Sequence, residues 1–424
     1  MKTLGARLLP AVIGLVAGIG LPAAAWSTEG YFQLGYSPVQ NGLGGAGVAN
    51  SEDAMSMALN PAGIVGVGRQ FQLGVGLFMP YRGYSSTGAG FVAPGGGTGS
   101  VESSDNLFLM PNMAYSHPLD ANSAIGIALY GNGGMNTTYK DTANAGCPAP
   151  GGVFCGGNTG VDLMQMFISP DYARRMGKFS FGIAPTLALQ TFKAKGLAAF
   201  GASSADAANL TNNGYDWSIG GGLRGGVQFD VTDQFRLAFS GQTKMWMTKF
   251  DKYAGLFADQ GSFDIPASIT AGFAYDINPR LTVMADFQRI FYSGVGSVGN
   301  SSASPPLFGT SGGPGFGWQD INVYKVGIEY RPNEMWTLRA GYAYNDNPVQ
   351  SADVMLNIIA PGVIQHHITA GATYKMSPKD SLDFAFVYAP DVKVTGTTPA
   401  AYGGQSVTLH MHQFFGQFGW THNF

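Results

Sequence analysis

The sequence predicts an all-β fold, a transmembrane antiparallel β-barrel of about 14 strands. Only 12% of the 424 residues are charged, against about 25% in soluble proteins, and 12% are aromatic. Beyond the N-terminal segment no run of about 18 apolar residues occurs, so no transmembrane helix is expected in the mature chain. From Arg69 onward apolar and polar residues alternate with period 2, which is typical of strands that face lipid on one side.

Residues 1–25 have the composition of a secretory signal peptide. Lys2 and Arg7 form the positive end, Leu8–Gly20 the apolar core, and Ala23–Ala25 the small-residue cleavage site. A membrane anchor is the alternative, but the apolar core is too short to span a bilayer. We therefore expect residues 1–25 to be removed on export.

A stretch rich in small residues, Gly42–Gly63, follows. Its first part, GLGGAG, matches the G-x-G-x-x-G pattern of dinucleotide-binding folds. That pattern requires a preceding strand and an acidic residue about 20 positions later, but Ser37–Pro38 precedes it and no Asp or Glu lies between Asp53 and Glu102. Nucleotide binding is therefore excluded. The stretch closes with NPAG, which favours a turn.

Together these motifs resemble the N-terminal hatch of the FadL/TodX family: a GLGGAG segment, an acidic and small linker, and NPAG, close behind a signal peptide. Members of that family are outer-membrane channels for long-chain fatty acids and aromatic hydrocarbons. The resemblance implies a hatch of residues 26–68 that plugs a barrel of residues 69–424. It places the hatch or gate at Gly42, Gly44, Gly47, Asn60, Pro61 and Gly63.

The resemblance also implies a transport route. Hydrophobic ligand enters an outer groove by passive uptake, moves to a pocket in the lumen, and leaves when the hatch shifts. Family members release it sideways beside a kinked third strand. Gly131, Gly133 and Gly134 lie at the expected end of this strand, where glycine permits a kink.

The barrel region has the pattern of membrane-spanning strands. In the first strand Phe71, Leu73 and Val75 share one face, with Gln72 and Gly74 on the other. Short turns are expected at residues 119–122, 177–178, 231–233, 278–280, 332–334 and 378–380. Long loops rich in Gly, Ser and Ala separate them. This asymmetry is the outer-membrane pattern, in which the short turns are periplasmic.

Alternation directs several charged side chains into the lumen, because Arg or Lys facing lipid at the membrane midplane costs about 2–4 kcal/mol. Arg224, Lys325 and Arg339 are the candidate ligand contacts among them. Three roles stay open for these cations: a porin constriction, ion pairs that anchor a plug, or binding of a ligand carboxylate.

Large apolar side chains also fall on the inward face. They are Phe108, Met110, Tyr130, Phe167 and Met284. A lumen that passes only hydrated solutes has no use for them. They predict either packing against the hatch or a hydrophobic ligand pocket, in which each buried CH₂ contributes about 0.8 kcal/mol.

Two outer loops carry apolar residues that predict ligand capture. Residues 195–213 have a helix-like composition, and residues 249–260 have apolar residues at helical spacing. A solvent-facing loop carries such a stripe only if it packs on something. In the resembling family these loops form the outer groove, and the alternative is two loops that pack on each other. The candidates are Leu197, Phe200, Phe250, Tyr253 and Phe257.

The only two cysteines, Cys147 and Cys155, lie close together in a long loop. In an oxidising compartment such a pair predicts a disulfide. A metal site would need further ligands nearby, and the flanking sequence supplies none. His410 and His412 share a face of the last strand, where polar residues at the barrel rim are the simpler interpretation, so no metal is expected.

The remaining function classes are disfavoured. No Ser/His/Asp arrangement or nucleophile elbow occurs, so neither enzymatic activity nor a cofactor is expected. The net charge is −3 without a basic block, which argues against nucleic acid. Expected partners are a hydrophobic small-molecule ligand, outer-membrane lipid and lipopolysaccharide, and the barrel-assembly machinery, whose signal the aromatic last strand ending in Phe424 resembles. A monomer is expected. The rivals are a non-selective or polar-solute porin and a structural or adhesive barrel.

Overall fold

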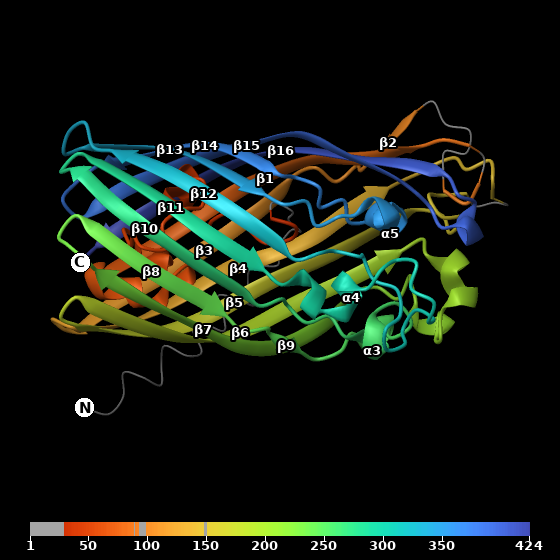
Figure 1. Cartoon of the computed structure of the whole chain (residues 1–424), viewed down its shortest axis with the longest axis horizontal. Helices are drawn as coiled ribbons and strands as arrows, with labels where there is room; N and C mark the ends of the chain where they lie inside the picture. The colour runs from red at the N-terminus through yellow and green to blue at the C-terminus, as the bar shows by residue number, and fades with distance from the viewer. Residues whose placement is uncertain (1–28, 89, 93–98, 148–150) are drawn as a thin grey trace.

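Fourteen long strands form a closed antiparallel barrel in the computed structural model, which describes residues 29–88, 90–92, 99–147 and 151–424 (Figure 1). Each long strand pairs with the next, and β16 (Ser406–Asn423) pairs with β1 (Gln70–Ser86) to close the wall. The predicted fold class, an antiparallel β-barrel of about 14 strands, is confirmed. The predicted signal peptide, residues 1–25, lies outside the described residues.

The other long strands follow in chain order between these two. They are β3 (Phe108–Asp120), β4 (Ser123–Tyr139), β5 (Thr159–Met176), β6 (Phe179–Lys195), β7 (Asp216–Asp230), β8 (Phe235–Gln242), β10 (Ser268–Asn278), β11 (Leu281–Ile290), β12 (Ile321–Tyr330), β13 (Trp336–Asn345), β14 (His366–Lys375) and β15 (Asp380–Thr397). Two short strands extend the wall: β2 (Ser100–Glu102) pairs with β1, and β9 (Trp246–Met247) pairs with β7.

The period-2 alternation sorts side chains between lipid and lumen. On β1, Leu73, Val75 and Leu77 point outward with 40–48% of their surface exposed, whereas Gln72 and Phe78 are buried inside the barrel. Apolar side chains meet lipid without losing polar contacts, and the polar ones find partners in the lumen. A slip by one residue would exchange the two sets, so the pattern also fixes the register of each strand.

The two ends of the barrel differ. Short turns join β3 to β4, β5 to β6, β7 to β8, β10 to β11, β12 to β13 and β14 to β15 at the end that holds the C-terminus (Figure 1). We call this the turn end and the opposite one the loop end. The loops of the loop end hold η3 (Ala198–Ser203), η4 (Ala207–Asn209), η5 (Asp251–Tyr253), α3 (Ala258–Gly261), η6 (Tyr292–Gly294), α4 (Gly296–Gly299), η7 (Ser351–Asp353), α5 (Val354–Asn357) and η8 (Ala400–Tyr402). Among the described residues, no helix is long and apolar enough to cross a membrane.

Residues 29–68, which we call the N-terminal segment, lie inside the barrel, where the orange-red trace fills the part nearer the turn end (Figure 1). The segment contains α2 (Pro38–Gly42), η1 (Ala54–Ala58) and η2 (Pro61–Gly66). α2 and η2 both begin with proline, whose missing N–H costs nothing at that position. These short elements follow the inner wall instead of forming one long helix.

Two glycines allow the N-terminal segment to approach the wall closely. A Cβ atom added at Gly42 would lie 3.0 Å from the Cα of Gly371 in β14. Gly44 has φ +66°, and a Cβ there would lie 2.8 Å from the backbone nitrogen of Tyr342 in β13. Any larger residue at either position would push the segment off the strands.

The expectation that the third strand ends at Gly131, Gly133 and Gly134 is wrong, because β4 continues to Tyr139. A bulge between Gly131 and Gly133 leaves Asn132 without a counterpart on β5. An extra residue of this kind reverses which parity faces inward. The glycines therefore mark a bend within the strand rather than its end.

The register of β12 can be tested with a charge. Val326 lies outward near the middle of this strand and is 49% exposed. Val326→Arg should lower the free energy of unfolding by about 2–4 kcal/mol, because it places a cation near the membrane midplane. Met335→Arg, beside the turn after β12, is the matched control and should cost about 0–1 kcal/mol. Urea unfolding in phospholipid vesicles measures both, and equal losses would contradict this register.

Candidate functional site

An apolar cavity lies at the loop end of the barrel, between β5, β6 and four long loops. Its lining is Val161, Phe192, Leu197, Phe200, Leu256, Phe257, Ser297, Phe308, Pro314, Gly315, Phe316, Leu356 and Ile359. The only hydroxyl in this lining, that of Ser297, already donates to the Ser262 carbonyl at 2.5 Å. The cavity therefore suits an apolar molecule.

The predicted capture residues divide between this lining and the layer behind it. Leu197, Phe200 and Phe257 line the cavity. Phe250 and Tyr253 lie behind Phe257, and the Phe250 and Phe257 rings are 6.0 Å apart between centroids. Both loops therefore contribute to one apolar wall, and they also pack on each other.

The helix expected over residues 249–260 is wrong. Only η5 and α3 form there, and Phe257 between them is extended, with ψ 143°. The apolar side chains still converge because the loop folds back on β6. The Tyr253 hydroxyl holds it there, accepting from the Ala194 N–H at 3.1 Å and donating to the Gly214 carbonyl at 2.5 Å.

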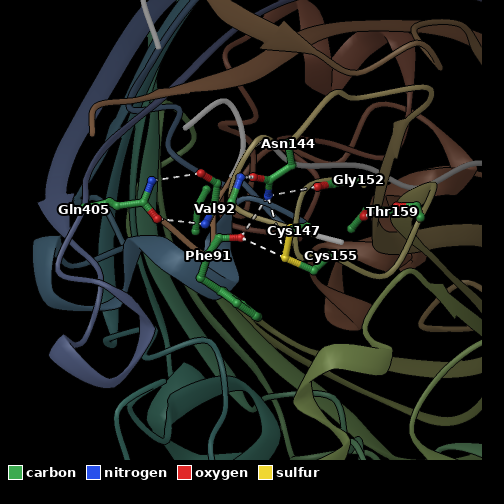
Figure 2. Close-up of a disulfide and its surroundings, with 10 residues drawn as sticks. Phe91, Val92, Asn144, Cys147, Gly152, Cys155, Thr159 and Gln405 are labelled. Carbon is green, nitrogen blue, oxygen red and sulfur yellow. Dashed lines mark hydrogen bonds between the residues drawn. A yellow bond between two sulfur atoms is a disulfide. The ribbon is translucent and has the colours of Figure 1, made fainter. Parts of the chain in front are cut away.

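A disulfide joins Cys147 and Cys155 at the loop end (Figure 2). In the same loop, the Asn144 side-chain amide donates to the Phe91 carbonyl at 3.1 Å. The Phe91 ring packs 5.1 Å from the ring of Phe200, which lines the cavity. The disulfide loop therefore holds the Phe91 ring against Phe200 in the cavity wall.

Aromatic rings connect the cavity to the N-terminal segment. Phe316 of the lining lies 6.2 Å from Trp318, and Trp318 lies 5.7 Å from Tyr31, between ring centroids. The Tyr292 hydroxyl accepts from the Tyr31 N–H at 3.1 Å and donates to the Glu29 carbonyl. Direct contacts therefore run from the cavity lining to the start of the segment.

A second, polar cavity lies in the lumen beside the N-terminal segment. Its lining is Gln33, Leu34, Tyr36, Leu59, Arg224, Ser240, Gly241, Gln242, Ser268, Thr270, Gln288 and Lys325. Arg224 brings a positive charge to it but is already engaged. Its guanidinium donates to the Ala58 carbonyl and, at 2.5 Å, to Gln242 Oε1.

The other two predicted luminal cations also bind the N-terminal segment. Lys325 donates to the Leu34 carbonyl at 3.0 Å and pairs with Glu29 at 2.8 Å. Arg339 pairs with Glu52 at 2.8 Å, and with Glu329 of β12 at 2.7 Å. This geometry favours the anchoring role over an open porin constriction, because each cation has a partner on the segment.

The predicted apolar lumen residues lie outside both cavities. Met284 packs against the N-terminal segment in a small buried cluster. Tyr130 and Phe167 pack on each other, 5.7 Å apart between ring centroids. Met110 is buried on β3, and Phe108 lies partly buried at the start of that strand. Packing inside the barrel accounts for all five.

The predicted gate residues are bound to one another and to the wall. Asp286 Oδ2 in β11 accepts from the N–H groups of Gly47 and Val48, both at 2.9 Å. The Asn60 amide donates to the Val48 carbonyl at 2.9 Å, and its Oδ1 accepts from the Ala62 N–H at 3.1 Å. Asn60 thus ties the NPAG turn to the glycine-rich stretch.

Sequence reasoning missed two groups of residues. Phe308, Phe316 and Trp318 come from the loop between β11 and β12, where aromatic residues in a Gly/Pro/Ser-rich stretch were an available signal. Glu29 and Glu52 are acidic residues in a segment that is otherwise mostly apolar or small. That contrast could have predicted ion pairs with the luminal cations.

The family described as "Outer membrane protein transport protein (OMPP1/FadL/TodX)" matches residues 37–414. The chain belongs to the FadL/TodX family. The resemblance inferred from the hatch motifs is therefore confirmed, and so is the outer-membrane location. Family membership identifies an outer-membrane transport protein and favours the predicted channel over a generic porin.

Two relatives and two solved structures extend this finding. The long-chain fatty acid transport proteins of Escherichia coli and Salmonella typhi are 24% and 23% identical over 87% of this chain, covering 90% and 89% of their own lengths. A Pseudomonas aeruginosa FadL homologue superimposes with a TM-score of 0.70 at 16% identity, covering 93% of this chain and all of its own. The Pseudomonas putida toluene transporter TodX gives 0.68 at 18%, covering 94% and 100%. These two structures support the fold of this FadL/TodX-family chain.

The anchoring of the N-terminal segment in this FadL/TodX-family barrel can be tested at Arg339. Arg339→Met leaves Glu52 and Glu329 with Arg331 alone, so the free energy of unfolding should fall by about 3 kcal/mol, the lower end of the cost of breaking a buried pair. Adding Glu52→Gln and Glu329→Gln removes the unbalanced charges and should recover part of the loss. Urea unfolding in vesicles compares the variants. A triple variant as unstable as the single one would argue against the pairing.

Proposed function

We propose that this protein is a passive, energy-independent channel for hydrophobic compounds, with no catalytic activity of its own. The observation that carries the proposal is the apolar lining of the cavity at the loop end, connected by aromatic contacts to a segment that occupies the lumen. Relatives named for long-chain fatty acid transport and structural neighbours named for toluene transport support this ligand class.

Ligand capture rests on the apolar lining. This lining is almost wholly hydrophobic and aromatic, as in most small-molecule pockets. Each CH₂ that leaves water for this lining contributes about 0.8 kcal/mol, so a short acyl chain or an aromatic ring binds without charged contacts. Leu197, Phe200 and Phe257 are the capture residues, and Phe250 and Tyr253 support them from behind.

The N-terminal segment acts as the gate. Gly42, Gly44 and Gly47 hold it against the wall, and the turn that contains Asn60, Pro61 and Gly63 fixes its return to β1. Arg224, Lys325 and Arg339 bind it in the closed position. Ligand can open it only if ligand binds the open state more tightly than the closed one. The contact of Tyr31 with Trp318 couples the segment to the ligand cavity.

Ligand leaves sideways at the β4 bulge. The chain of the N-terminal segment occupies this bulge, since Phe32 pairs with Gly133 and the Gly134 N–H donates to the Tyr31 carbonyl at 3.2 Å. When the segment withdraws, those bonds are lost and the wall loosens beside Asn132.

The protein works as a monomer in contact with outer-membrane lipid and lipopolysaccharide. The barrel-assembly machinery recognises β16, whose outward face is aromatic and which ends next to Phe424. Closure of the barrel within a single chain supports the monomeric state.

The capture role is tested by a double variant, Phe200→Ser with Phe257→Ser. Replacing two lining rings should raise the half-saturating concentration for uptake of radiolabelled oleate or toluene at least about tenfold, because a tenfold change corresponds to about 1.4 kcal/mol and each buried ring contributes about 1.5–3 kcal/mol. Cells that lack other hydrophobic channels are the host.

Phe250→Ser is the comparison variant, since it removes an equally buried ring from the same loop that supports the lining without being part of it. It should raise the half-saturating concentration much less than the double variant does. Equal effects of the double variant and the comparison variant, at normal surface levels, would contradict capture by this cavity.

The gate role is tested by Asn60→Ala with Pro61→Gly. The double variant removes the amide contacts to Val48 and Ala62 and the fixed φ of proline, so the closed state should weaken and the resting conductance should rise. Deleting Gly42–Leu59 should go further and give a wide, open channel. Single-channel recording in planar bilayers measures both.

Folding is the control for these variants. Their heat-modifiable migration in detergent gels should match the native protein, because the fourteen strands remain intact. A large native conductance that the deletion leaves unchanged would mean that the segment does not close the lumen, and a porin function would then replace this one.

A further inference from the structure

The wall of the barrel contains an interruption between β5 and β6. The two strands pair from Gly160 opposite Lys195 to Ile168 opposite Leu187, and again from Tyr172 opposite Ile183. The three positions between are left out of the pairing, although the register is the same on both sides. Pro170 and Pro185 lie opposite each other at their centre.

The interruption follows from the covalent structure of proline. Neither proline has an N–H group, so two hydrogen bonds that would join the strands at this point are missing. Proline is unusual within a central strand for this reason, and two facing prolines compound the effect. We call this interruption the proline seam. Pairing of β5 with β4 and of β6 with β7 continues past it, through Pro170 opposite Ile127 and Pro185 opposite Leu223.

The inner side of the seam is held by a single side-chain contact. The hydroxyls of Ser169 and Thr186 lie 2.9 Å apart and share a hydrogen bond. The neighbouring inward residues on β6, Gly182, Ala184 and Ala188, are small. On the outer side both prolines are exposed to lipid. On β5 the inward neighbours of Ser169 are Phe167 and the buried carboxylate Asp171, so small groups line the β6 side of the seam only.

The NPAG turn packs against the seam from inside the barrel. A Cβ atom at Gly182 would overlap Pro61, so the turn rests directly on β6 beside the seam. A Cβ at Gly226 on β7 would likewise overlap the Asn60 amide. Moving the turn would uncover this part of the wall.

We propose that the proline seam is a second sideways exit, through which hydrophobic ligand passes from the lumen into the half of the membrane nearer the turn end. The inference rests on the proposed channel function and adds a route to it. β5 and β6 also line the apolar cavity through Val161 and Phe192, so one pair of strands leads from capture to the seam. An apolar molecule gains by leaving into lipid rather than into the watery space beyond the turn end.

The seam differs from the β4 bulge in what closes it. At the bulge, the backbone of the N-terminal segment supplies replacement bonds. At the seam, the Ser169–Thr186 bond and the packed turn supply the closure, and neither proline can donate a backbone bond. Opening the seam requires that the NPAG turn move and that the Ser169 and Thr186 hydroxyls separate, while the pairings of β5 with β4 and of β6 with β7 stay intact.

A disulfide across the seam tests the proposal. Ser169→Cys with Thr186→Cys places two thiols where the hydroxyls now meet. Oxidation should lower the initial rate of radiolabelled toluene entry by the share that passes the seam, about twofold when the β4 bulge carries the other half. Dithiothreitol should restore it. Arg175→Cys with Ser180→Cys joins the same strands where they pair normally and is the matched control, which should transport at the native rate in both states.

A second variant avoids any dependence on disulfide formation. Pro170→Val with Pro185→Val restores both N–H donors, and hydrogen exchange should show two newly protected amides together with slower toluene entry. Native-rate transport by the oxidised seam variant, or by the valine variant with its amides protected, overturns the exit. If the native protein itself fails to raise toluene entry above that of cells lacking it, the proposed channel function fails, which is a different result.

Discussion

Every feature of this protein depends on one constraint, that backbone polar groups within the bilayer must bond to protein. Closure of β1 onto β16 satisfies it for the wall and leaves no open edge. Side chains then have only two directions, so apolar residues such as Leu73 go to lipid and polar ones such as Gln72 go inside. The resulting polar lumen has to be filled by water or by protein. Here residues 29–68 occupy much of it.

Two kinds of contact hold this filling in place. Lys325 and Arg339 bind acidic and carbonyl groups of the N-terminal segment. Apolar residues of the segment, among them Leu34 and Met55, are also buried in the hydrophobic core of the barrel. Ion pairs inside proteins contribute little net stability when compared with apolar packing of the same volume. The packing therefore stabilises the segment inside the barrel, and the pairs fix where its polar groups lie.

Much of this architecture could be predicted, because the membrane imposes a local pattern. Alternation along each strand and the short turns depend on neighbouring residues, so about fourteen strands could be predicted from the sequence. The contact of Arg224 with Ala58 and that of Phe200 with Phe308 join residues more than a hundred positions apart, for which no local signal exists. The helix expected over residues 249–260 failed because the same spacing also suits a loop packed on aromatic rings. The bend at Asn132 was anticipated from its glycines, but a bulge inside a strand and a strand end look alike in sequence.

The enclosure of the N-terminal segment has a consequence for biogenesis. The segment bonds to strands around the whole circumference, from β1 through β7 and β11 to β14. A barrel that closes around this segment must enclose it before the last strand pair forms, or admit it through one of its ends. The segment directly precedes β1, and the last joint is the one between β1 and β16. Enclosure of the segment and the final step of assembly therefore involve the same strand, β1. A misplaced segment would hinder the pairing of β1 with β16, and it could still be repositioned while the barrel is open.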